Sequence, residues 1–153
     1  MSFISLVTIV VADYDSAIRF YLDVLGFELV EDSPSLTNDG RPKRWVVVRP
    51  PGAETGILLA QADGDEQRLA IGNQVRGRVG FFLRVDDFDA AHARMIKADV
   101  EFVKPPRSEP YGTVAVFVDI AGNFGISSAR RVDAGSRCAP LDRAHPSVHT
   151  NRQ

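Results

Sequence analysis

An internal repeat constrains this chain of 153 residues more than any other feature. The segment VADYDSA at residues 11–17 is matched by VDDFDAA at residues 85–91, an offset of 74 residues. FELV at residues 27–30 is then matched by VEFV at residues 100–103, an offset of 73. Repeats at this spacing are typical of duplicated supersecondary units, because solenoid repeats are shorter. We expect the two units to enclose a ligand cleft, and the turn after the helix to absorb the one-residue difference.

Each copy of the repeat is predicted to fold in the order β-α-β-β-β. The first helix should begin at Asp13 or Asp15 and end at Gly26, which suit a helix N-cap and C-cap. Residues 33–41 are rich in Ser, Pro, Asn and Asp and should form a loop, and Pro105-Pro106 should form a turn. The expected helices are 15–25 and 87–98, and the expected strands are 3–11, 27–32, 45–49, 56–60, 78–85, 100–103, 114–118 and 124–128.

These patterns predict an α+β fold in which two tandem β-α-β-β-β modules form a cup-shaped mixed sheet. The expected organisation is a first module at 3–62, a linker at 63–77 with a short helix near 66–69, a second module at 78–130, and a weakly structured tail at 131–153.

Composition limits the partners of the chain. The net charge of −2 argues against nucleic-acid binding, and no apolar run approaches the ~20 residues that span a bilayer. The N-terminus lacks the pattern of a secretion signal, and the single cysteine, Cys138, cannot form an internal disulfide. We therefore expect a cytoplasmic protein that binds neither nucleic acid nor membranes.

Several segments carry a resemblance to a known family. AIRFY at residues 17–21, LGF at 25–27, EPYGTVAVF at 109–117 and DIAGN at 119–123 are similar to segments of the vicinal oxygen chelate superfamily. That superfamily contains glyoxalase I, bleomycin-resistance proteins and extradiol dioxygenases. The resemblance implies the same duplicated fold, and it leaves the activity open because one fold carries many chemistries.

The resemblance also implies a divalent metal held by four side chains, usually His or Glu, near the start of each module's first strand and the end of its last strand. In this chain those positions fall on Leu6, on Gly80, on Ile126, and on Leu58 or Leu59. None of these residues has the oxygen, nitrogen or sulfur donor that a metal needs. We therefore predict no metal and no other cofactor.

Strand alternation predicts which residues line the cup. Thr8 should face inward with Leu6, and Phe82 and Arg84 should face inward with Gly80. For Phe82 and Phe124, packing in the sheet core is the favoured alternative. Trp45, the only tryptophan, would either stack on a planar ligand or cover the core. The predicted ligand-binding residues are Thr8, Trp45, Phe82, Arg84, Tyr111, Phe124 and Ser128.

Other polar residues have structural interpretations. The aspartates before each helix should cap it, His92 should pack on its helix, and Arg107 and Glu109 should brace a hairpin or contact ligand beside Tyr111. His145 and His149 should be solvated in the tail. We find no acid–base pair directed into the cup.

Three functions are compatible with these observations. The first is a binding protein that traps a small apolar or aromatic ligand without a metal. The second is a metal-dependent glyoxalase-type lyase or extradiol dioxygenase with displaced ligands, and the third is a metal-free isomerase or lyase. The exposed sheet edges of single modules also lead us to expect a homodimer.

Overall fold

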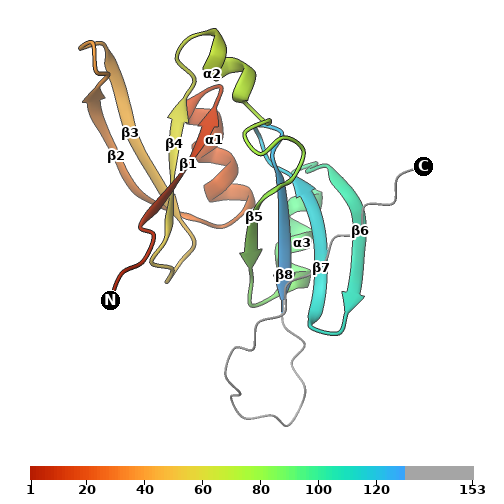
Figure 1. Cartoon of the computed structure of the whole chain (residues 1–153). Coiled ribbons are helices and arrows are strands. Elements are labelled where there is room, and N and C mark those ends of the chain that lie inside the picture. Colours follow the sequence, from red (N-terminus) through yellow and green to blue (C-terminus); the bar gives the residue numbers. More distant parts are fainter. Residues whose placement is uncertain (130–153) are drawn as a thin grey trace.

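The computed structural model describes residues 1–129 as two mixed sheets of four strands, each covered on one face by helix (Figure 1). The α+β class and the two β-α-β-β-β modules are confirmed. The first module contains β1 (Leu6–Val11), α1 (Tyr14–Arg19), η1 (Phe20–Val24), β2 (Glu28–Leu36), β3 (Pro42–Arg49) and β4 (Gly56–Gln61). A short helix, α2 (Asp65–Ala70), leads to β5 (Val79–Arg84), α3 (Phe88–Lys97), β6 (Phe102–Glu109), β7 (Gly112–Val118) and β8 (Phe124–Ala129).

The two sheets have the same topology. Their strand orders are β1-β4-β3-β2 and β5-β8-β7-β6, and in each sheet the first strand runs parallel to the last while the other neighbours are antiparallel. The sheets lie beside each other with α1 between them, and α3 covers the second sheet (Figure 1). The repeat in the sequence is therefore a repeat in the fold.

The helices of the two modules begin alike and continue differently. Asp13 and Asp87 are the N-caps, and each carboxylate accepts a hydrogen bond from the backbone N–H three residues later. Gly26 and Asp99, just past the helices, both have positive φ, but Gly26 follows Asp13 by 13 residues and Asp99 follows Asp87 by 12. The extra residue of the first copy is accommodated inside the helix, where it forms the π-helical turn η1. Most π-helical structure in proteins occurs as single turns of this kind within helices. The expectation that the turn absorbs it is wrong.

Two further expectations about local structure are wrong. Residues 33–36 continue β2 and residues 42–44 begin β3, so only the short tip between them is a turn. Pro105 and Pro106 lie inside β6, where the register with β7 shifts between Lys104 and Arg107. Proline is tolerated there because β6 is an edge strand and the pairing is irregular.

One apolar core joins the two modules. It includes Ile9, Tyr21 and Leu59 from the first module and Leu83, Met95 and Phe117 from the second. A buried polar contact crosses the same boundary, because the hydroxyl of Tyr21 donates to Oδ2 of Asp119 at 2.8 Å. Burial and the neighbouring Asp119 carboxylate raise the pKa of Tyr21 well above 10, so this phenol stays protonated. The predicted tail 131–153, with Cys138, His145 and His149, lies outside the described residues.

Candidate functional site

The face of each sheet that turns away from the helices, here called its open face, is identified by strand alternation. On β3, Val46 and Val48 belong to the core, so Lys43, Trp45, Val47 and Arg49 lie on the open face of the first sheet. Leu58 and Ala60 share that face on β4, because Ile57 and Leu59 are in the core. A row of residues with one cation at each end and an indole between them therefore runs along β3.

The first sheet is incomplete at one end. Pairing between β3 and β4 extends only from Val46↔Leu59 to Val48↔Ile57. Beyond the Val46↔Leu59 pair the two strands separate. There β3 remains paired with β2 as far as Pro42, and β4 remains paired with β1 as far as Gln61. The β2–β3 hairpin therefore splays away from β4 (Figure 1), which leaves a gap between two strands that would otherwise be hydrogen-bonded.

Tyr14, the first residue of α1, closes the helix side of this gap. Its hydroxyl accepts a hydrogen bond from the backbone N–H of Arg44 at 3.3 Å, and its backbone N–H donates to Oε1 of Gln61 at 3.4 Å. The Tyr14 hydroxyl thus provides an acceptor for a backbone N–H in the stretch of β3 that has separated from β4. The ring also lies 5.1 Å from the guanidinium carbon of Arg44, close enough for a cation–π contact.

A pocket of about 510 Å³ occupies the gap. Its lining combines an aromatic ring, an apolar floor and a charged rim. It is lined by Tyr14, Thr37, Asn38, Asp39, Arg41, Pro42, Lys43, Arg44, Trp45, Leu58, Leu59, Ala60, Gln61, Ala62, Asp63 and Gln67. Its volume lies within the range of sites that hold small organic molecules, although more than half of its lining residues are polar or charged.

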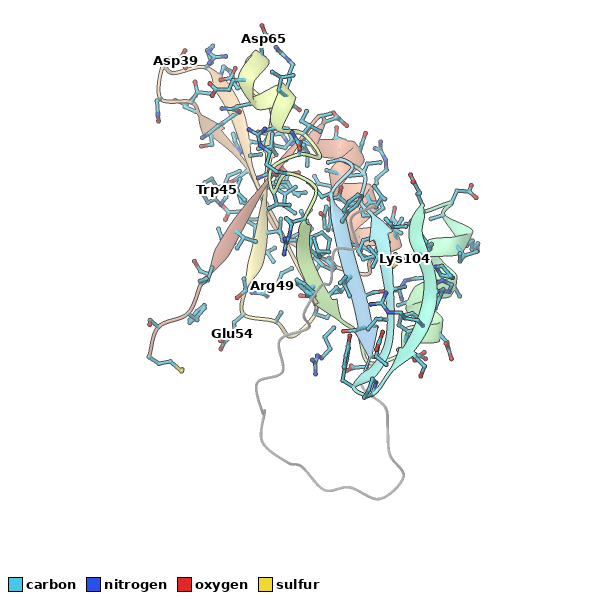
Figure 2. All side chains as sticks on the ribbon, turned by 45° about the vertical axis from the view of Figure 1, so that its right-hand side comes forward. Asp39, Trp45, Arg49, Glu54, Asp65 and Lys104 are labelled. Atoms are coloured by element: carbon cyan, nitrogen blue, oxygen red, sulfur yellow. The ribbon has the colours of Figure 1, made fainter. Side chains whose placement is uncertain are left out.

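Arg41 ties the rim of the pocket together. Its guanidinium contacts Asp39 at the hairpin tip at 2.9 Å and Asp63 after β4 at 2.7 Å. Figure 2 shows Asp39 at the tip of the hairpin, near Asp65 at the start of α2. Hydrogen bonds from Arg41 and Thr37 lower the pKa of Asp39 to about 2, and Arg41 also lowers the pKa of Asp63. Both carboxylates are therefore ionised at neutral pH.

The other two cations of the lining differ from each other. Arg44 points to the helix side of β3, where it contacts Asp15 at 2.8 Å and Asp32 at 2.7 Å. Lys43 lies on the open face, is exposed, and forms no ion pair within the described residues.

The predicted ligand-binding residues fall in three places. Thr8 and Trp45 lie on the open face of the first sheet, and of the seven residues only Trp45 lines the pocket. Phe82, Arg84, Phe124 and Ser128 lie on the open face of the second sheet, since Phe81, Leu83 and Ser127 are turned toward the helices. Tyr111 is exposed in the β6–β7 turn, and Arg107 beside it contacts Glu109 at 2.6 Å.

A family model described as the Glyoxalase/Bleomycin resistance protein/Dioxygenase superfamily matches residues 4–127. The chain belongs to this superfamily. A protein of Shewanella frigidimarina is 49% identical over 119 residues, which are 77% of this chain and 86% of the relative. The crystal structure of UcmS2 is 32% identical with a TM-score of 0.68, over 84% of this chain and 98% of that one. TnmS3, an antibiotic binding protein from Streptomyces sp. CB03234, is 30% identical with a TM-score of 0.66, over 85% and 97%.

The metal positions of the glyoxalase superfamily do not fit a metal in this chain. Leu6 and Leu58 lie on the open face of the first sheet, whereas Leu59 is fully buried in the core. Gly80 and Ile126 occupy the corresponding places on the second sheet. The four side chains offer no donor atom, and nowhere in residues 1–129 do three or more His, Cys, Asp or Glu gather to hold an ion.

Sequence reasoning missed most of the pocket. The cluster of Ser, Pro, Asn and Asp before Arg41 predicts a loop, and the expected strand begins only at Trp45, so Pro42 and Lys43 fall outside it. The alternation of Lys43, Trp45, Val47 and Arg49 with Arg44, Val46 and Val48 is the signal that could have extended β3 to Pro42.

The interpretation of His92 as a packing residue is confirmed, because its ring lies 5.7 Å from that of Phe88 and 4.7 Å from that of Phe102. No helix within residues 1–129 is long and apolar enough to cross a bilayer.

Proposed function

We propose that this member of the glyoxalase/bleomycin resistance superfamily binds a planar aromatic small molecule in the gap between β3 and β4, without a metal. The observation that carries the proposal is the pocket itself, which opens where the β3–β4 pairing stops and which has Trp45 on its wall. An indole presents a large flat surface, and stacked aromatic pairs contribute about 0.5–1.5 kcal/mol beyond the area that they bury.

The family positions favour binding over metal chemistry. Leu6, Leu58, Gly80 and Ile126 supply apolar surface or open space where a Lewis-acid enzyme of this superfamily would need donor side chains. TnmS3, an antibiotic binding protein, covers most of this chain at 30% identity, which also supports binding.

Trp45 makes the proposal directly testable, because it is the only tryptophan. We expect planar aromatic compounds to quench its fluorescence and to shift its single indole N–H signal in a ¹⁵N-labelled sample. Ala60→Phe, which fills the floor of the pocket, should abolish both responses, while Phe82→Ser on the other sheet should leave them unchanged. An indole signal that no compound in a broad aromatic panel moves would contradict the proposal.

Metal dependence needs a separate measurement. We expect untagged protein incubated with Zn²⁺, Ni²⁺, Mn²⁺ or Fe²⁺ and then desalted to retain no stoichiometric metal by elemental analysis. One metal ion retained per chain would instead support a lyase or dioxygenase with ligands at unexpected positions.

Assembly and location are part of the same proposal. β1 and β2, and β5 and β6, are the edge strands of the two sheets. A homodimer would cover part of these edges and of the open faces, and sedimentation equilibrium should give twice the chain mass. The single cysteine is compatible with a cytoplasmic protein.

A further inference from the structure

We infer that the ligand of this pocket carries an anionic group, of the carboxylate or sulfonate class, which pairs with Lys43 while its aromatic ring lies against Trp45. This inference rests on the proposed function and adds the charge of the ligand to it.

Two of the three cations that line the pocket are already paired with carboxylates. The guanidinium of Arg41 is bound by Asp39 and Asp63, and that of Arg44 by Asp15 and Asp32. The ammonium of Lys43 is the one cationic group of the lining without a carboxylate within 4.0 Å in the described part of the chain. Of the three cations, Lys43 is therefore the one whose donors are available to an incoming anion.

The cross-strand partner of Lys43 on β2 is not a carboxylate either. Arg49, at the opposite end of the same open-face row, lies across from Glu28 on β2, and their side chains approach to 3.9 Å. Lys43 lies across from Ser35, and Trp45 lies across from Ser33. Directly opposed residues on one sheet face are the pairs that interact most strongly. The strand that supplies a carboxylate for Arg49 supplies only a hydroxyl for Lys43.

The spacing of Lys43 and Trp45 suits contact with a single rigid ligand. Lys43 and Trp45 are two residues apart on one strand, so their side chains leave the sheet on the same face about 7 Å apart. An anion attached directly to a fused aromatic system places its charge within that distance of the ring centre. One rigid molecule can therefore contact the indole and the ammonium together, and its two interactions share a single cost of immobilisation.

The experiment compares two dyes that differ in one group. 1-Anilinonaphthalene-8-sulfonate carries a sulfonate, and N-phenyl-1-naphthylamine has the same aromatic frame without it. Binding of each is followed by the indole N–H signal of Trp45, which responds to the pocket and not to apolar surface elsewhere. The variants are Lys43→Met, Lys43→Arg and Lys104→Met, the last removing a lysine on β6 of the other sheet (Figure 2).

We expect Lys43→Met to weaken binding of the sulfonate dye about three- to tenfold more than binding of the neutral dye. This is the range for a partly exposed charge-assisted contact. Lys43→Arg should retain most of the preference for the sulfonate dye, and Lys104→Met should leave it unchanged. Added salt should reduce that preference in every protein except Lys43→Met, which lacks the charge. Equal responses of both dyes to Lys43→Met would overturn the inference and leave the proposed function standing. A wild-type Trp45 signal that neither dye moves would also count against the inference, while the proposed function is tested separately by the broad aromatic panel.

Discussion

The two modules share one topology, but they close their sheets differently. In the second module β7 pairs with β8 from Thr113 to Val118, along nearly its whole length. In the first module the equivalent pairing of β3 with β4 stops after Val46–Val48, and the pocket opens beyond it. A duplicated fold has thus kept one copy as a continuous sheet and opened the other.

The repeat itself contains a residue that accompanies this difference. Tyr14 occupies the place of Phe88, 74 residues later. The hydroxyl of Tyr14 accepts the N–H of Arg44 where β4 has withdrawn, whereas Phe88 has no hydroxyl and packs against His92. One polar atom therefore helps to satisfy the splayed strand in the copy whose sheet opens, and it is lacking in the copy whose sheet stays continuous.

The largest expected effect comes from deleting one helical residue in each copy. Deletion of exposed Ala93 from α3 should rotate buried Met95 by about 100° off the core, costing about 3–5 kcal/mol or abolishing folding. Deletion of exposed Asp23 should convert η1 to an α-helical turn and keep both ends in register, with a loss below about 1.5 kcal/mol. Urea unfolding measures both, and equal losses would contradict our account of η1.

These helices also show how far sequence reasoning reaches. The aspartate caps, the apolar spacing and the one-residue difference are all readable along the chain, and they predict two modules of the observed order. The place where the extra residue is accommodated is not readable, because a turn and a π-helical turn satisfy the same local pattern. The pocket is harder still, since it depends on where β3 and β4 stop pairing, a contact between segments that the sequence separates.

The next largest effect concerns the contact that joins the copies. Asp119 accepts hydrogen bonds from the backbone N–H groups of Ala121 and Asn123 and from the side chains of Asn123 and Tyr21, all between 2.8 and 3.0 Å. Asp119→Ala leaves these donors unpaired in a buried site, so we expect a loss of about 3 kcal/mol in unfolding free energy. Glu101→Ala, at an exposed site in the same module, is the control and should stay within about 0.5 kcal/mol of wild type.

The same contact predicts a dependence on alkaline pH. Burial and the Asp119 carboxylate raise the pKa of Tyr21 above its unfolded value of 10.0. The unfolded chain therefore loses this proton first, so the stabilisation is complete below pH 10 and is lost as pH rises toward the folded pKa. Tyr21→Phe should lose less stability than wild type between pH 9.5 and about 11 by thermal unfolding. Parallel curves for the two proteins would show that Tyr21 does not titrate as proposed.

A smaller effect is expected from exchanging the two aromatic residues of the repeat. Tyr14→Phe leaves the N–H of Arg44 without its acceptor, and we expect a loss of about 1 kcal/mol together with weaker ligand binding at Trp45. Phe88→Tyr adds a hydroxyl to the buried cluster that contains Ala115 and Ala129, so it should lower stability without affecting the pocket. The decisive readout is the Trp45 signal, which Tyr14→Phe alone should change.

The smallest effect lies at one matched position of the two sheets. Leu59 lies opposite Ile9 in the first sheet, and Ser127 lies opposite the equivalent Leu83 in the second. Both are buried, but the Ser127 hydroxyl has no hydrogen-bond partner among residues 1–129. Ser127→Ala should raise the free energy of unfolding by about 0.5–1 kcal/mol, because it removes an unpaired buried polar atom.

Ser127→Leu, which copies the first module, should instead lower stability, since the ring of Phe117 already lies under 3 Å from a Cβ built at neighbouring Gly125. Opposite signs for these two substitutions would show that the second sheet has been packed around a small residue, and that the copies have diverged in their cores as well as at the pocket.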